Sequence, residues 1–240
     1  MTRVAIIAAI PGELKPLIRG WRHESRNGAD LWHWRHAQGE WVAACAGMGI
    51  DAASRAFAEI EREGAVDSVI STGWAGALRE KVGAGRAYTV SGVVDARSGE
   101  RIATTAPSGG YWLVTCDGIA SHAEKERLAA SHGAELVDME AAEVGRLAAR
   151  RGIPFCCIKG VSDGLADQLP DFNGFISSNG QFQALRFILF AILRPWHWPA
   201  LARLGQNSKK AAQSIRDALL HVLDEREILR KPDVRSNPQS

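Results

Sequence analysis

Short apolar runs alternate with amphipathic segments along most of the chain. The run at residues 4–10 is apolar throughout, and those at 66–72 and 154–161 are largely so, which is typical of strands buried on both faces of a sheet. Segments with apolar residues three and four positions apart predict helices instead. Further strands are predicted at residues 31–34, 41–46, 87–94 and 111–115, and helices at residues 51–63, 123–131, 140–151 and 208–223. This alternation predicts an α/β fold of three layers, with a central mixed sheet flanked by helices.

The length and composition are those of one globular domain. With 240 residues, of which 46% are hydrophobic, the chain has enough material for a large core, and we predict a single domain over residues 1–225. Residues 226–240 are charged and contain prolines, so we expect a flexible tail there.

Charge and cysteine content narrow the classes of function. The net charge of +2 provides no basic field for nucleic acid. No run of about 18 apolar residues predicts a transmembrane helix, and the N-terminus lacks the pattern of a signal peptide. The four cysteines lack the spacing of metal ligands, so we expect them to be reduced thiols in a cytoplasmic protein. We also expect neither a metal ion nor an organic cofactor.

Polar or Gly-rich residues stand at the ends of four predicted strands, at residues 12–13, 47–49, 72–73 and 162–163. In α/β sheets, ligands collect beyond the carboxyl ends of strands. Each segment alone is explained as well by a turn, a helix cap or a solvated charge. Their joint presence favours a binding site.

Three segments with fixed order and spacing carry the chemistry. They are AAIPGEL at residues 8–14, VISTGWAG at 69–76, and VDMEAA at 137–142, the last followed after a helix by IKGVSD at 158–163. This combination resembles the nucleoside phosphorylase/nucleosidase superfamily, and particularly its methylthioadenosine/S-adenosylhomocysteine nucleosidase branch. The resemblance covers residues 3–168 and the predicted helix at 208–223.

The resemblance implies a role for three carboxylates in cleaving an N-ribosyl bond. Asp163, oriented by Ser162, would protonate the leaving purine, which requires a raised pKa that burial can supply. Glu140 would accept hydrogen bonds from the ribose hydroxyls, with Met139 packed on the sugar, and Glu13 would position an attacking water. Ile119 and Ala120 correspond to the residues that hold adenine.

The acceptor of the ribosyl group stays open between phosphate and water. Purine phosphorylases of the superfamily carry an Arg before the segment that matches Thr72-Gly73-Trp74, and a Ser at its third position. Here Ser71 stands in place of the Arg, and Trp74 stands in place of the Ser. The Trp74 indole is either a stacking surface for the ligand or part of the core. The remaining candidates for a phosphate or water site are Gly12, Gly49, Thr72 and Gly73, with Lys15 or Arg19 as a further donor. Inorganic phosphate is the co-substrate in the first case.

An insertion at residues 171–203 contains an apolar segment at 187–193, followed by PWHWP at 195–199. No Asp or Glu occurs from residue 174 to residue 216. Aromatic and basic residues beside an apolar helix predict contact with a membrane surface, although burial in the core or in a dimer interface is the alternative. The predicted membrane-contact residues are Arg186, Phe187, Phe190, Arg194, Trp196 and Trp198.

This insertion, with RPWHWPAL at residues 194–201 and SKKAA at 208–212, resembles the hopanoid-associated phosphorylases. The resemblance implies release of adenine from adenosylhopane, giving ribosyl- or phosphoribosylhopane. It also implies a homodimer or higher homo-oligomer bound peripherally to the inner face of the bacterial cytoplasmic membrane. Two alternatives stay open: a soluble methylthioadenosine/S-adenosylhomocysteine nucleosidase, and a non-catalytic protein that binds nucleosides or lipids.

Overall fold

A computed structural model describes residues 2–37, 39–167, 169–177 and 179–228, with side chains to residue 223. The predicted tail therefore lies mostly outside the described residues. In chain order the elements are β1 Thr2–Ala8, α1 Pro11–Leu14, β2 Arg22–Arg26, β3 Ala29–His36, β4 Gly39–Cys45, α2 Ile50–Glu61, β5 Ser68–Ser71, β6 Trp74–Ala77, β7 Ala87–Asp95, β8 Arg101–Ala103, β9 Tyr111–Thr115, α3 His122–His132, β10 Leu136–Asp138, α4 Ala141–Arg151, β11 Phe155–Asp163, η1 Asn173–Phe175, α5 Ala184–Ile192, η2 Pro195–His197 and α6 Trp198–Ile228.

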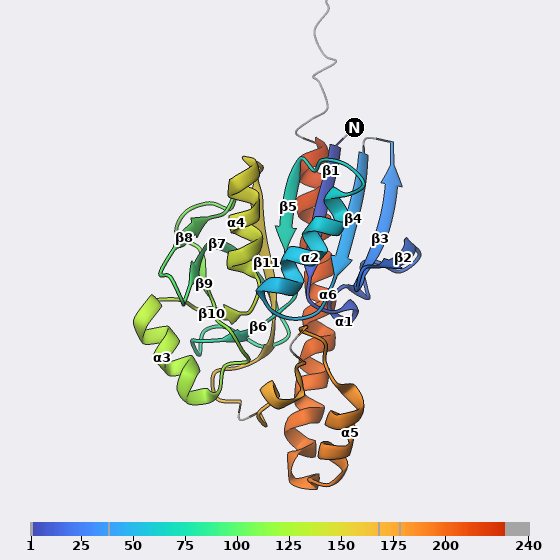
Figure 1. The fold of residues 1–240 in the computed structure, drawn as a ribbon. Coiled ribbons are helices and arrows are strands. Elements are labelled where there is room, and N and C mark those ends of the chain that lie inside the picture. The colour runs from blue at the N-terminus through green and yellow to red at the C-terminus, as the bar shows by residue number, and fades with distance from the viewer. Residues whose placement is uncertain (1, 38, 168, 178, 229–240) are drawn as a thin grey trace, which may run out of the picture.

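An 11-stranded mixed sheet forms the centre of the described structure (Figure 1), in the order β2-β3-β4-β1-β5-β11-β6-β10-β9-β7-β8. Strand β1 runs parallel to β4 and β5, and the first part of β11 runs parallel to β5. The later part of β11 pairs with β6 on one side and antiparallel with β7 on the other. The half of the sheet that contains β6, β10, β9 and β7 therefore closes on β11.

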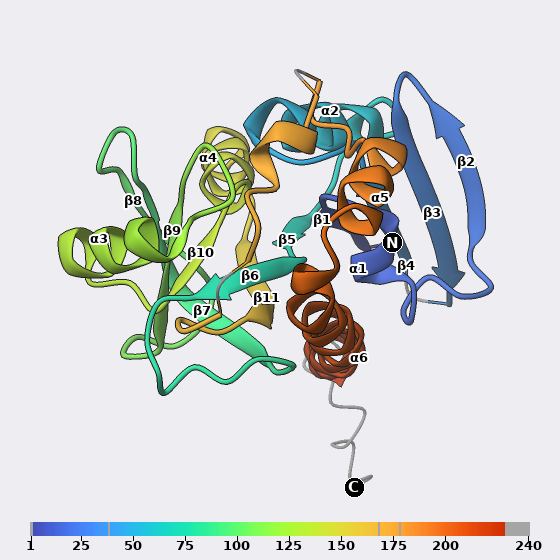
Figure 2. The ribbon, with the colours of Figure 1, turned by 90° about the horizontal axis from the view of Figure 1, so that it is seen from below.

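Helices cover both faces of the sheet (Figure 2), so the predicted three-layer α/β fold is confirmed. Helices α2 and α4 cover one face, where Phe57 and Val144 belong to a core with Val69 of β5. Helix α6 crosses the other face, where Ile215 packs with Ile158 of β11. Burial of these apolar side chains is the main driving force for assembling the layers.

Short strands are the elements that the sequence pattern did not predict. Strand β6 begins directly after Gly73, and β8 and β10 are each three residues long, so none has a recognisable alternation. Strand β2 is largely polar because it lies at the edge of the sheet. Helix α6 begins ten residues before the predicted start at residue 208, because Pro199 occupies its first turn, where proline is tolerated.

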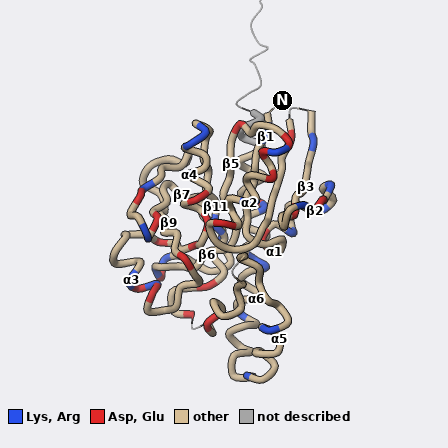
Figure 3. Tube along the Cα trace, in the orientation of Figure 1, with Lys and Arg blue, Asp and Glu red and all other residues tan. Residues whose placement is uncertain are grey.

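The insertion forms a protrusion below the body of the molecule in Figure 1, made of α5 and the first part of α6. Lys and Arg occur along this protrusion without Asp or Glu (Figure 3). Nearly all large apolar residues that are exposed in the described structure lie here: Leu185, Ile188, Leu189, Ile192, Leu193, Trp196 and Trp198. We call these seven residues the outer apolar face.

The predicted membrane-contact set needs one correction. The rings of Phe187 and Phe190 do not belong to the outer apolar face. They pack within the insertion, where both contact Phe175 and Phe187 also contacts Phe172. The helical repeat explains this, because residues 185, 188, 189 and 192 share one face of α5 and Phe187 and Phe190 lie on the other. Among the described residues, no helix is long and apolar enough to cross a bilayer.

Candidate active site

A cavity of about 1110 Å³ opens where β1, β10 and β11 end and where β6 begins. The structure brings Glu13, Glu140 and Asp163 to this one cavity, although they lie far apart in the sequence. All three are buried. Part of the lining comes from the insertion and α6, so the cavity spans two parts of the molecule.

Asp163 stands at the end of β11, where the register against β6 shifts between Val161 and Asp163. A bulge of this kind changes the direction of a side chain at a strand end. The Ser162 hydroxyl donates to Asp163 Oδ1 at 2.6 Å, as the predicted orienting role requires. The Lys125 ammonium forms an ion pair with Asp163 Oδ2 and donates to the Gly164 carbonyl at 2.8 Å.

Lys125 is a site residue that the sequence analysis missed. It is only 2% exposed and lines the cavity, although it belongs to α3, whose other charged residues lie at the surface. Nothing in the pattern of α3 distinguishes Lys125 from its charged neighbours Glu124 and Glu126, because the helix has almost no apolar face. The ion pair with Asp163 offsets the free-energy cost of burying the Lys125 charge, because an unpaired buried charge is strongly destabilising.

Glu140 lies at the start of α4 and accepts a hydrogen bond from the Gly49 backbone N–H at 2.7 Å. Burial, followed by repulsion from the Asp138 carboxylate, raises the pKa of Glu140 to about 8. Beside it, Lys159 is completely buried, with its Nζ 2.8 Å from Asp138 Oδ2 and donating to the Thr72 carbonyl at 3.0 Å. Burial alone would lower the pKa of Lys159, but the negative charge of Asp138 outweighs it and keeps the ammonium protonated.

The Asp138 carboxylate has three donors. Besides Lys159, the Thr115 hydroxyl donates to Oδ1 at 2.6 Å and the Ala141 backbone N–H donates to Oδ2 at 2.9 Å. A buried ion pair with these partners holds the β10–α4 junction, which carries Glu140, against β11, which carries Asp163.

The buried Glu140 carboxyl should make stability depend on pH. A carboxyl whose pKa is raised on folding stabilises the fold below its unfolded pKa and loses this contribution as pH rises through its folded pKa. The stability of the wild type relative to Glu140→Gln should therefore fall between about pH 4.5 and pH 8, by at most about 1.4 kcal/mol per pH unit. Urea unfolding of both proteins from pH 5 to pH 9 measures this, and parallel stability curves would contradict the raised pKa.

Glu13 is held by backbone amides. Its Oε2 accepts hydrogen bonds from the N–H groups of Ala9 and Ile10, at 2.8 and 3.1 Å, and its Oε1 accepts from Trp74 N–H at 2.8 Å. Burial raises the pKa of Glu13, although these hydrogen bonds oppose the increase. Gly73, at φ +122°, packs so close that a Cβ atom there would lie 2.9 Å from the carboxyl group.

The donors predicted for a phosphate or water site are only partly assembled. Gly12 lines the cavity, whereas Gly49, Thr72 and Gly73 do not. The Gly49 N–H is bonded to Glu140, and the Thr72 N–H donates to the Ile7 carbonyl at 2.8 Å. Gly73 lies behind the Glu13 carboxyl rather than facing the cavity. The structure therefore does not bring these three residues to the cavity, and their role stays a prediction.

Trp74 lines the cavity and is also fixed in place. Its indole N–H donates to the Ser208 carbonyl of α6 at 3.1 Å, and its ring packs beside Gly12. The indole therefore combines the two alternatives that the sequence left open, because it packs on α6 and presents a surface to the cavity.

The segment predicted to hold a purine base also lines the cavity, through Ile119, Ala120 and Met139. The backbone groups of Ile119 are bonded to the Asn173 side chain, whose Oδ1 accepts from Ile119 N–H at 2.8 Å and whose Nδ2 donates to the Ile119 carbonyl at 3.0 Å. Adenine offers the same pair of an acceptor and a donor on one edge. A base that used Ile119 would therefore have to displace this carboxamide.

Much of the cavity lining is apolar. It includes Leu169, side chains of the insertion and side chains of the first part of α6: Phe172, Phe182, Phe187, Leu201 and Leu204. The inner side of α5 thus lines the cavity, while its other side belongs to the outer apolar face.

Comparison with known proteins finds one matching family model and several solved structures of similar fold. Residues 3–111 and 104–185 match the model of the phosphorylase superfamily, whereas no curated protein matches the chain. Similar solved structures include the 5'-methylthioadenosine/S-adenosylhomocysteine nucleosidase of Helicobacter pylori, with 16% identity over 94% of this chain and 99% of that chain, at a TM-score of 0.69. Futalosine hydrolase of the same organism has 16% identity over 93% and 98%, at 0.70. The 5'-methylthioadenosine nucleosidase of Arabidopsis thaliana has 17% identity over 94% and 96%, at 0.72. At such identities these structures share the fold.

Proposed function

The chain belongs to the phosphorylase superfamily and is an N-ribosyl-cleaving enzyme, and from this premise we propose that it releases adenine from adenosylhopane. The observation that carries the proposal is the form of the cavity. Its lining combines the carboxyl groups of Glu140 and Asp163 with apolar side chains, several of them from the insertion. Its volume of about 1110 Å³ lies at the upper limit of ordinary small-molecule sites, which are about 300–1,000 Å³.

The carboxyl groups account for cleavage of the N-ribosyl bond. As the bond between the anomeric carbon and the purine breaks, its electron pair moves to the base. The acid form of Asp163, rather than the carboxylate paired with Lys125, would protonate the base. The sugar acquires oxocarbenium character, as in glycoside hydrolysis, and the ionised form of Glu140 would stabilise it while accepting hydrogen bonds from the ribose hydroxyls. Ser162 and Lys125 hold the Asp163 carboxyl in place.

The apolar lining fits a substrate with a large hydrocarbon body. The outer apolar face and the neighbouring Arg186 and Arg194 are suited to a membrane surface that contains anionic lipids. A lipid nucleoside would then place its adenosine head beside the acids and the adjoining part of its hydrocarbon body against the apolar lining, while the rest of that body stays in the bilayer. We therefore propose peripheral binding to the inner face of the bacterial cytoplasmic membrane, and the predicted homo-oligomer stays a prediction.

Water is the acceptor that the geometry favours. Phosphate binding in such sites uses backbone N–H groups. Here the amides of Ala9, Ile10 and Trp74 already donate to Glu13, so that a carboxylate of the chain occupies the donors that a phosphate dianion would need. We propose hydrolysis: a water adds to the anomeric carbon and passes its proton to Glu13, so that ribosylhopane is the lipid product.

Adenine release measured by chromatography tests this proposal. Adenosylhopane in vesicles, methylthioadenosine and S-adenosylhomocysteine are compared with and without phosphate, and the lipid product is identified by mass. We expect release from adenosylhopane, independent of phosphate, to give the ribosyl product. Release from the two small nucleosides alone would favour the second candidate, a soluble nucleosidase, which the likeness to methylthioadenosine nucleosidases supports. Release from none of the three would contradict both.

A further inference from the structure

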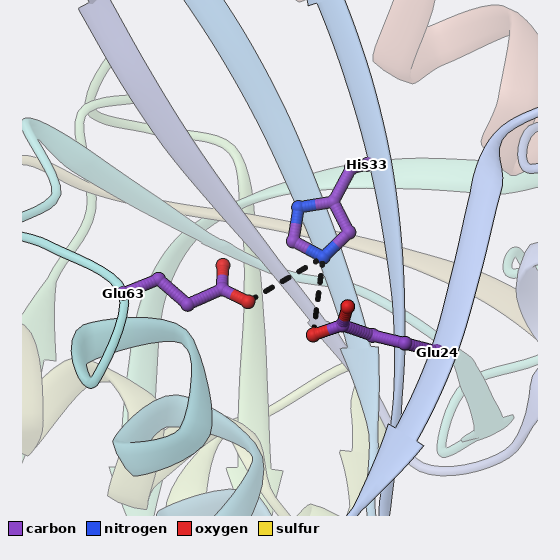
Figure 4. Close-up of side chains that lie close together, drawn as sticks. All are labelled: Glu24, His33 and Glu63. Atoms are coloured by element: carbon purple, nitrogen blue, oxygen red, sulfur yellow. Dashed lines mark ion pairs between the residues drawn. The ribbon is translucent and has the colours of Figure 1, made fainter.

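A cluster of side chains lies where β2 and β3 form one edge of the sheet (Figure 4), and none of them lines the cavity. His33 of β3 faces Glu24 of β2 and Glu63, which follows α2. His33 Nε2 lies 3.9 Å from Glu24 Oε1 and 3.6 Å from Glu63 Oε1. One ligand atom from each residue lies within 4.8 Å of the other two.

The His33 ring is buried without a hydrogen bond. The residue is 5% exposed, and neither ring nitrogen has a hydrogen-bond partner among the described residues. Leaving a buried polar group unbonded costs about 1–3 kcal/mol. Both nitrogens point at carboxylates that lie too far away for good hydrogen bonds, so the ring is aimed at acceptors that it does not reach directly.

The spacing fits a metal ion between the three side chains. With metal–ligand distances of about 2.0–2.2 Å, the ligand atoms of a tetrahedral Zn²⁺ site lie roughly 3.3–3.6 Å apart. The 3.6 Å separation from Glu63 agrees with this range, and the 3.9 Å separation from Glu24 needs a small adjustment. Both carboxylates are partly open to solvent, with 31% and 21% of their side chains exposed, so an ion could enter.

The second nitrogen of the ring has the partner that such sites use. His33 Nδ1 lies 3.5 Å from Glu40 Oε1, and Arg3 and Arg35 hold the Glu40 carboxylate at 3.0 and 3.1 Å. A carboxylate at the far nitrogen of a metal-binding histidine fixes the ring tautomer and increases its basicity. Glu40 is placed for this role.

We propose that Glu24, His33 and Glu63 bind one divalent transition-metal ion, with Zn²⁺ as the best match to one imidazole and two carboxylates. The ion would connect the β2–β3 hairpin to the segment after α2, far from the cavity. The sequence did not predict this site because its three ligands belong to three separate segments.

Arg26 competes for the same carboxylate oxygens. Its Nη1 lies 3.3 Å from Glu24 Oε1 and its Nη2 lies 3.0 Å from Glu63 Oε1, while its Nε pairs with Glu59 at 3.0 Å. Metal binding would therefore require the Nη atoms to turn away while Nε stays with Glu59. Arg26→Gln should consequently bind the metal more tightly than the wild type.

The test uses the full chain after removal of metals with EDTA. Zn²⁺ is titrated by calorimetry, and Co²⁺ replaces it so that visible absorption reports the geometry. We expect one equivalent of metal, tetrahedral Co²⁺ bands without a thiolate charge-transfer band, and a thermal midpoint that rises with Zn²⁺. Glu63→Gln and His33→Gln should each weaken binding at least tenfold, and the thermal midpoint of each variant without metal shows whether it folds.

His23→Gln is the matched control, because His23 is an exposed histidine on the same hairpin. It should bind Zn²⁺ as the wild type does. Absence of stoichiometric Zn²⁺ binding to the wild type would overturn the proposal, and so would unchanged binding by Glu63→Gln and His33→Gln. Each readout is a binding or thermal measurement, so the result does not depend on the proposed reaction.

Discussion

Replacement of Asp163 by asparagine should lower turnover by about 10²–10⁴-fold, the usual contribution of a positioned acid. Asparagine keeps the size of the side chain and its contact with Ser162, but it has no proton to give to the leaving base. Binding of an adenine analogue should change much less. Single-turnover adenine release and calorimetric binding of the analogue separate the two effects.

The same substitution leaves the buried Lys125 ammonium without its partner, and breaking a buried ion pair costs about 3–5 kcal/mol. The control is therefore the double variant Asp163→Asn/Lys125→Met, which removes both buried charges. If the loss of activity came from misfolding, the double variant would regain activity together with stability. We expect it to regain stability only, and near-wild-type turnover in either variant would remove Asp163 from its role.

Replacing four residues of α5 by serine should abolish binding to anionic vesicles. The four residues are Leu185, Ile188, Leu189 and Ile192. Each of these side chains is at least 50% exposed, so its loss should leave the fold intact. Burying one such side chain in lipid contributes about 1.5–3 kcal/mol, so four substitutions should weaken binding by at least about 100-fold. Vesicle sedimentation measures this effect.

Trp34→Ser is the control for this prediction, because Trp34 is exposed on β3, away from the protrusion. It should bind vesicles like the wild type. Hydrolysis of a water-soluble nucleoside substrate should survive in the fourfold variant. If that variant still binds vesicles but has become smaller by light scattering, the outer apolar face is a subunit interface instead, which is the alternative that the sequence left open.

The three-layer fold and most of the sheet could be predicted from hydrophobic periodicity, because buried parallel strands and amphipathic helices have distinct repeats. Strand β6 and strand β10 could not, since the register of their neighbours defines them rather than any pattern of their own. The orientation of α5 was also beyond the sequence. Its segment is apolar on every side, so nothing showed that Phe187 would face the cavity and Leu189 the solvent.

The convergence of the acids could be expected because their segments follow strands of one sheet. The residues that hold these acids in place could not be predicted. Lys125 and Lys159 are buried cations, and a lysine in a strand or on a polar helix ordinarily lies at the surface. The hydrogen bonds of Glu13 depend on the path of the backbone around Trp74, which only the tertiary structure defines.

Strand β11 carries Lys159 and Asp163 four positions apart, and every one of its residues is buried. It pairs with β5 in one half of the sheet and with β6 and β7 in the other. Such a strand cannot fray locally, because opening it would separate both halves at once. Its amide hydrogens should exchange with solvent only when the whole domain unfolds. Lys159 and Asp163 should therefore keep their positions for as long as the domain is folded.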